Sequence, residues 1–331
     1  CRDACRSNHI KKAHRKIMPA ELKFILFQIM VILPFIAGFF LKKKLADPSV
    51  FSRKLVRVNI IALDPLIALW SIWGLDLSGG LFMLPAAGIL LSGAGFLIGL
   101  ASPGLANLEN KSRKTFLISS CLANHGFTMG GFICYLIAGE KGLGLAAIFV
   151  SYFLPFVFTI VFPYAASSGH SIFSLDYFRR QFISLQNMPL YAVIAAICLK
   201  SCGINRPENF YFPLDLLIAL SIILYYLTLG TNFSVKDLAG VKKLHLGLAV
   251  IKFFILPAAA WATLQFVHLD PAIEMVILIQ SFMPAAIYSV VTSILYDLDT
   301  RLASGLFVAN TLLFIIIVLP AVFMVRGNLL Q

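Results

Sequence analysis

Charged residues are scarce in this chain of 331 residues. Only 13% of the residues are Asp, Glu, Lys or Arg, whereas 60% are apolar and the mean hydropathy is +0.89. Soluble globular domains carry about 25% charged residues. The shortage of charge excludes an ordinary soluble globular protein. We expect an all-α polytopic membrane protein that has the lipid bilayer as its main partner.

Acidic residues are the scarcer of the charged types, with 15 Asp and Glu against 27 Lys and Arg, which gives a formal net charge of +12. A basic chain can bind nucleic acid, but here the Lys and Arg lie in short runs between apolar stretches. In such positions they orient membrane spans and contact anionic lipid headgroups. We therefore expect no nucleic-acid partner.

The sequence also lacks the motifs of common catalytic sites. It contains no nucleophile elbow, phosphate-binding glycine loop, HExxH helix or CxxC pair. Six cysteines are present, at Cys1, Cys5, Cys121, Cys134, Cys198 and Cys202. None has metal-ligand spacing with paired His, and we interpret the last four as small core residues. We expect no enzyme, no metal site and no cofactor.

Apolar stretches long enough to cross about 30 Å of hydrocarbon as helices are abundant. The first five lie near residues 22–41, 51–74, 80–101, 115–138 and 143–166. Five more lie near residues 182–201, 211–231, 244–266, 271–295 and 302–325. The second set repeats the first at an offset of about 160 residues. The spacing predicts about ten transmembrane helices in two five-helix repeats, and the short sixth stretch leaves a count of nine open.

Because five is an odd number, the second repeat would enter the membrane from the opposite side, so the repeats would be inverted. The predicted organisation is a basic tail over residues 1–17, which we interpret as non-native, a first repeat over 18–166 and a second over 182–331. Lys and Arg are concentrated in the connections after the odd-numbered spans, which places both termini outside.

Polar and glycine residues interrupt the fourth stretch at 119–131, and a second interruption lies in the ninth stretch at 280–286. An interrupted helix in lipid exposes N–H and C=O groups that must contact protein, water or a ligand. Interruptions at matching places in two repeats are typical of a transporter's substrate site. We expect the fourth and ninth helices to be broken and to cross.

The first interruption contains three candidate substrate-binding residues. Asn124 and His125 offer hydrogen bonds at mid-membrane depth, and Gly126 allows the helix to unwind. The alternative interpretation is a tightly packed glycine-rich helix, in which Asn124 and His125 bind neighbouring backbone.

The second interruption contains Gln280, Ser281 and Pro284. Pro284 removes a backbone donor and frees the carbonyl one turn earlier, near Gln280. A simple proline kink is the alternative. Asn310 in the tenth stretch is a further substrate-binding candidate.

Two ionisable residues lie within apolar stretches. Asp64, just before Pro65, is the most deeply placed acid, and it is either a proton-coupling group or a structural partner, because burying a carboxylate is costly. Lys252 in the eighth stretch could balance Asp64 or attract an anion. We expect it instead to extend its ammonium to the membrane surface, because it lies near one end.

Several segments together carry a family resemblance that runs from about Phe35 to the C-terminus. They are residues 122–131, 139–143, 251–252, 256–257, 283–286, 296–299, 302–304 and 310–312. On these segments the chain resembles the auxin efflux carrier family of permeases, within the bile acid, arsenite and riboflavin transporter superfamily.

The resemblance implies ten helices in inverted repeats, with the fourth and ninth crossing at the substrate site. It also implies transport of organic anions such as auxin-like acids or small dicarboxylates, with Asn124 as a site residue and Pro284 at the crossover. The chain departs from the family where Thr128 and Met129 replace the usual leucine and proline, and where Asp64 replaces an apolar residue.

The leading hypothesis is a secondary transporter, by symport or efflux, that moves a small organic anion by alternating access in a bacterial inner membrane. Either His125 or Asp64 would take a proton. One alternative is a sodium-coupled symporter of the bile acid type, although no carboxylate lies beside the amides of the interruptions. The other is a membrane sensor that binds a ligand without moving it. The sequence leaves open whether the chain forms a homodimer.

Overall fold

The computed structural model describes residues 20–76, 80–102, 107–127, 129–166, 183, 185–207, 210–233 and 242–329. Within these ranges the regular elements are all helices, and one isolated β-bridge is present. The predicted basic tail over 1–17 lies outside the described residues, as does Thr128.

Helices occupy the apolar stretches of the first half. The elements in chain order are α2 (Ala20–Leu41), α3 (Pro48–Val58), η2 (Asn59–Leu63), α4 (Asp64–Trp73), α5 (Met83–Leu100), α6 (Asn110–Cys121), α7 (Gly130–Val150), α8 (Phe153–Phe156), η4 (Val157–Val161) and α9 (Phe162–Ala166). The fourth stretch is interrupted between α6 and α7, as predicted.

The second half has a similar composition of elements. They are α11 (Met188–Ser201), α12 (Leu214–Asn232), α13 (Lys242–Val250), η7 (Ile251–Ile255), α14 (Leu256–Leu264), α15 (Pro271–Ser281), α16 (Ile287–Leu295), α17 (Thr300–Leu313), η8 (Phe314–Val318) and α18 (Leu319–Leu329). The ninth stretch is interrupted between α15 and α16. A count of ten spans and an inverted arrangement stay predictions.

Six helical segments among the described residues are long and apolar enough to cross a membrane. They are Val50–Trp73, Met83–Leu100, Gly130–Ala166, Leu214–Asn232, Lys243–Leu264 and Thr300–Met324. Large apolar side chains on these segments are exposed, among them Leu90 at 70%, Phe254 at 70% and Ile316 at 68%. Such surfaces are suited to lipid, which supports a multi-pass membrane protein.

The segment Gly130–Ala166 is not one straight helix. Its 37 residues would extend about 55 Å, well beyond the hydrocarbon thickness of about 30 Å. At Gly139 the backbone has φ 62° and ψ −147°, which is not helical. A Cβ on Gly142 would collide with the carbonyl oxygen of Cys134, a contact that a straight helix cannot make over eight residues. The chain therefore folds back at Gly139.

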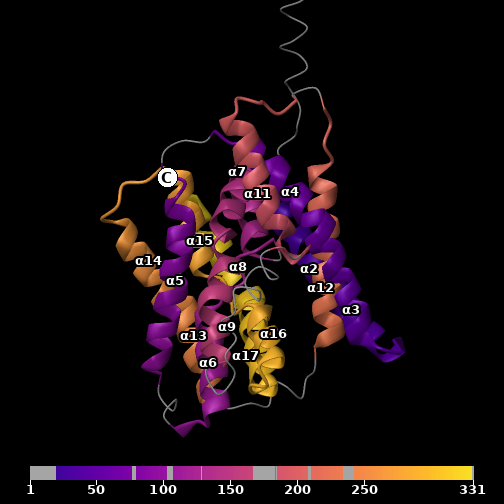
Figure 1. The fold of residues 1–331 in the computed structure, drawn as a ribbon, viewed down its shortest axis with the longest axis vertical. Helices are drawn as coiled ribbons and strands as arrows, with labels where there is room; N and C mark the ends of the chain where they lie inside the picture. Colours follow the sequence, from indigo (N-terminus) through magenta and orange to yellow (C-terminus); the bar gives the residue numbers. More distant parts are fainter. Residues whose placement is uncertain are drawn as a thin grey trace, which may run out of the picture.

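The helices form two groups (Figure 1). The first group contains α2, α3, α4, α11 and α12, and the second contains α5, α6 and the elements from α13 to α17, with α7 in contact with both. Within the first group α2 and α12 approach backbone to backbone. A Cβ on Gly38 would collide with the carbonyl oxygen of Leu227, and a Cβ on Gly230 with that of Phe35.

Four helices contain a π-helical turn that ends two residues before a proline. In each, the residue before the proline donates its N–H to the carbonyl five residues earlier, over η2, η4, η7 and η8. The prolines are Pro65, Pro163, Pro257 and Pro320. Proline lacks an N–H, and its ring clashes with the carbonyl four residues back. The extra residue of the π turn keeps the helix continuous past the proline.

Candidate functional site

The two interruptions meet, and their backbones bind each other. Ala123 and Ala285 form the isolated antiparallel bridge. The N–H of Asn124 donates to the carbonyl of Pro284 over 2.8 Å, and the N–H of Ala286 donates to the carbonyl of Leu122 over 3.1 Å. We call residues 122–124 and 284–286 the crossing. Its hydrogen bonds satisfy backbone groups that an interrupted helix would leave unpaired in an apolar interior.

Four helix ends adjoin the crossing. The helices α6 and α15 end at Cys121 and Ser281, and α7 and α16 begin at Gly130 and Ile287. A helix carries about half a positive charge at its N-terminus and about half a negative charge at its C-terminus. The crossing therefore brings together two positive and two negative helix ends.

Pro284 ends the first half of the ninth stretch. The N–H of Met283 already donates to the carbonyl of Gln280 over 3.2 Å, and Pro284 has no N–H with which to continue the helix. The carbonyl that the proline was expected to free near Gln280 is thus occupied by Met283. Pro284 instead uses its own carbonyl to accept the hydrogen bond from Asn124.

Gly130 allows the two interruptions to approach each other closely. A Cβ at this position would collide with Oε1 of Gln280, whose Nε2 donates to the carbonyl of His125 over 3.1 Å. At Gly126, by contrast, a Cβ would meet no atom within 4 Å. Its carbonyl accepts the N–H of Met129 and Gly131, so its role is in the loop and not in the close approach.

Two buried amides each keep one polar atom without a partner. Oδ1 of Asn310 accepts the N–H of Ala285 over 2.9 Å, which joins α17 to the crossing. Nδ2 of Asn310 and Oε1 of Gln280 have no hydrogen-bond partner among the described residues. Ser281 differs, since its hydroxyl donates back to Leu278 within α15 over 2.6 Å. The structure therefore brings Asn310 and Gln280 to the crossing and turns the Ser281 hydroxyl to its own helix.

His125 and Asn124 differ in their hydrogen bonds and in their burial. Nδ1 of His125 lies 2.9 Å from the hydroxyl of Tyr152, which lies 2.8 Å from the hydroxyl of Ser92 in α5. His125 is 2% exposed, and this series of hydrogen bonds fixes the orientation of its ring. Asn124 is less buried than its neighbours. Its carbonyl accepts the N–H of Gly130 over 3.2 Å.

Asp64 lies outside the crossing, in the first helix group. Oδ1 accepts the hydroxyl of Ser221 over 3.0 Å, and Oδ2 accepts that of Tyr225 over 2.5 Å. Asn59, five residues earlier, donates to the carbonyl of Ser221 over 3.1 Å. The carboxylate is buried and has no cation within ion-pair distance among the described residues. It thus joins α4 to α12.

The expectation for Lys252 is wrong. Its side chain does not extend to the membrane surface: the residue is 0% exposed, and Nζ donates to the carbonyl of Leu122 over 3.1 Å. The sequence gives the position of a residue along a helix but not the neighbours that cover it. The interpretation of Cys198 and Cys202 as core residues is also wrong, since both are exposed, whereas Cys121 and Cys134 are buried.

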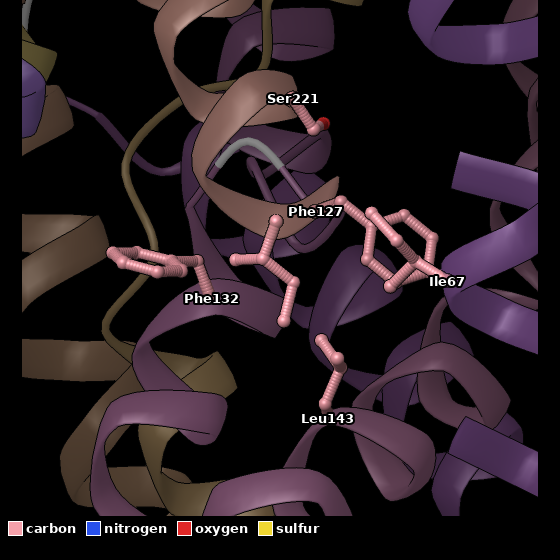
Figure 2. A pocket seen from close by; sticks show the side chains of 6 residues that line it. Ile67, Phe127, Phe132, Leu143 and Ser221 are labelled. Atoms are coloured by element: carbon pink, nitrogen blue, oxygen red, sulfur yellow. The ribbon is translucent and has the colours of Figure 1, made fainter. Parts of the chain in front are cut away.

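A very small recess of about 10 Å³ lies between α4, α7 and α12 (Figure 2). It is lined by Ile67 of α4, Ile218 and Ser221 of α12, Leu143 and Phe132 of α7, and Phe127. Ligand pockets usually measure about 300–1,000 Å³. The recess is therefore far too small to hold a ligand in this structure, and Ser221, which lines it, also donates to Asp64.

Polar contacts tie α7 to the first helix group on the side where α7 folds back. Arg206 pairs with Glu140 of α7, and the hydroxyl of Tyr135 donates to Asp215 of α12. Arg206 also lies 4.7 Å from the ring centre of Trp70. These contacts hold α7 against the first helix group.

The loop between α16 and α17 is attached to the start of α6. Asp297 pairs with Lys111, and Ser112 donates to Asp299 over 2.7 Å. The ammonium of Lys111 lowers the pKa of the exposed Asp297 carboxyl below its ordinary value. The start of the fourth stretch and the end of the ninth stretch are thus held together, in addition to their pairing at the crossing.

Comparison with known proteins gives a partial similarity. A protein of Methanocaldococcus jannaschii that is described as an uncharacterized transporter is 27% identical over 135 residues, which is 40% of this chain and 44% of that protein. The matched region thus spans less than half of the relative. No family model matches the chain, and the resemblance to auxin efflux carriers stays a prediction.

Proposed function

We propose that the protein is a secondary transporter that moves a small organic anion across a membrane by alternating access. The observation that carries the proposal is the crossing, where two interrupted helices pair their backbones at residues 122–124 and 284–286. Such discontinuous helices are characteristic of transporter binding sites. The similarity to a described transporter supports the same class.

The chemistry around the crossing favours an anion with an apolar body. The N-termini of α7 and α16 supply positive helix ends for a carboxylate. Beside them, the recess is lined mainly by aliphatic and aromatic side chains. Asn124, His125, Gln280, Ser281, Pro284 and Asn310 form the proposed substrate region, and Gly126 belongs to the loop of this region, with open space at its Cα. Within it, the unpaired atoms of Gln280 and Asn310 are available to a ligand when the space opens.

Asp64 is the proposed proton-coupling group. Its carboxylate accepts two hydroxyls and no cation in the described part of the chain, and a buried charge without a partner is costly. Ser221 both donates to Asp64 and lines the recess. A substrate that enters the recess would alter this hydrogen bond, which gives a direct route for coupling.

Two inverted five-helix repeats are the proposed architecture. The interruptions lie in the fourth and ninth stretches, and the π turns η4 and η8 begin at Val157 and Phe314, 157 residues apart. Each precedes a proline by the same number of residues. Matched breaks and matched π turns support a repeated unit.

The test is uptake of radiolabelled acids by proteoliposomes that contain the purified chain. We expect uptake of indole-3-acetate or another acid with an apolar body to exceed that of malonate, and a pH gradient to stimulate it. Asp64→Asn should retain exchange at equal pH but lose the stimulation, because the amide cannot release a proton. Asp76→Asn, at an exposed carboxylate away from the crossing and the recess, is the matched control. Stimulation that persists in Asp64→Asn would reject Asp64 as the coupling group.

A further inference from the structure

Lys252 places a buried cation directly on the crossing. The residue lies in the π turn η7 and is 0% exposed. Its Nζ donates over 3.1 Å to the carbonyl of Leu122, the same oxygen that accepts the N–H of Ala286. The ammonium therefore binds a backbone oxygen that belongs to the pairing of the two interruptions.

The surroundings of Lys252 contain no acid among the described residues. The elements packed against η7 and α13 are α5, α6, α14 and α17, and none of them contains Asp or Glu. The titratable side chains that interact electrostatically with Lys252 are Cys121 and His125. The Nζ of Lys252 thus contacts the carbonyl of Leu122 and no carboxylate among the described residues.

Lys252 does not face the recess. The lining residues come from α4, α7, α12 and the loop at Phe127, whereas η7 packs against α5, α13 and α14. The ammonium reaches the crossing from within the second helix group. Its position is therefore unsuited to direct contact with a substrate in the recess.

A cation at this place has a clear physical role. The C-terminus of α6 ends at Cys121, so the carbonyl of Leu122 lies at the negative end of that helix. In transporters with discontinuous helices, such carbonyls and helix ends coordinate a coupling cation. A metal ion at this carbonyl would have to displace the Nζ of Lys252, which already donates to it.

We propose that Lys252 is a tethered cation that occupies the place of a coupling metal ion at the crossing, so that the protein works without sodium. The functional part of this inference rests on the proposed transport activity. The structural part concerns the cation site alone, and it can be measured without a substrate.

The experiment removes the side chain and offers a free cation instead. Thermal unfolding of the full chain in detergent is measured in choline chloride, sodium chloride and methylammonium chloride at equal ionic strength. The wild type should unfold at the same temperature in all three salts. Lys252→Ala should unfold at a lower temperature in choline and regain part of the loss, saturably, with methylammonium or sodium. If this variant does not fold, Lys252→Gln replaces it.

Lys114 provides the matched control, because it is also a buried lysine on a backbone carbonyl, that of Ala165 at 3.3 Å, but away from the crossing. Lys114→Ala should show no rescue by cations. Stabilisation of the wild type by sodium, or failure of any cation to stabilise the Lys252 variants, would overturn the proposal. In proteoliposomes, wild-type exchange of a transported acid should be unchanged when sodium is replaced by choline. If the wild type moves no acid, the transport function fails, and the unfolding result still judges the cation site.

Discussion

Gly126 and Gly130 lie four residues apart, but they differ in the space that is available for a side chain. The space beside Gly126 is open, whereas Gly130 faces Oε1 of Gln280. The sequence shows both as glycines in one polar segment and cannot rank them. The difference arises from α15, about 150 residues further along the chain, so it depends on the tertiary fold.

A pair of alanine substitutions tests this difference. Gly130→Ala should displace Gln280 and lower stability by about 1–3 kcal/mol, because the added methyl group overlaps a buried side chain. It should also reduce transport. Gly126→Ala should change both quantities little. Unfolding in detergent and acid uptake measure the two effects, and equal behaviour of the two variants would contradict the described packing.

At the scale of elements, residues with non-helical φ and ψ angles determine where helices change direction. The fold-back of α7 depends on Gly139, whose φ of 62° and ψ of −147° are accessible to glycine but strained for other residues. No atom lies within 4 Å of a Cβ built there, so the constraint is conformational and not steric crowding.

Substitution at Gly139 separates conformation from packing. Gly139→Ala should lower the free energy of unfolding by about 1–3 kcal/mol because of backbone strain. Gly93→Ala in α5 is the matched control, since its Cβ also meets no atom within 4 Å and its backbone is helical. That change should be neutral or stabilising within about 1 kcal/mol. The comparison fails if both variants unfold alike.

Much of the helical pattern is predictable from the sequence, because apolar stretches and their interruptions depend on local composition. The breaks after Cys121 and Ser281 follow from glycine, polar residues and proline near those positions. The π turns could not be predicted from the sequence. A proline indicates that the helix is disturbed there, but it does not indicate that the preceding turn becomes π-helical. Lys252 could not be placed, because its burial depends on helices α5 and α6 from another part of the chain.

At the scale of the whole molecule, polar contacts hold the first helix group against α7, which also packs against the second group. Arg206 pairs with Glu140, and Tyr135 donates to Asp215. Between α4, α7 and α12 lies the small recess. Under the proposed alternating access, the contacts of Arg206 and Tyr135 break as a space opens at the recess, so they influence the balance between closed and open forms.

A charge exchange tests the pairing of Arg206 and Glu140. Arg206→Glu should place two like charges together, favour the open form and alter the uptake rate by several-fold. The double variant Arg206→Glu with Glu140→Arg should restore part of the wild-type rate, because the pair is reformed in reverse. Arg206 also contacts Trp70, so restoration will be incomplete. Additive defects in the double variant would show that the pair does not couple the groups.

The most direct test of the account is uptake of labelled indole-3-acetate by proteoliposomes with Asn124→Ala and Pro284→Leu, compared with the wild type and with Gly126→Ala at equal protein insertion. The two crossing variants should lose at least about tenfold in rate. Asn124→Ala removes the side-chain amide proposed to bind the substrate, and Pro284→Leu supplies the backbone N–H whose absence helps to end α15. Gly126→Ala should retain most of the activity. Full uptake by both crossing variants would contradict the claim that the crossing is the transport site.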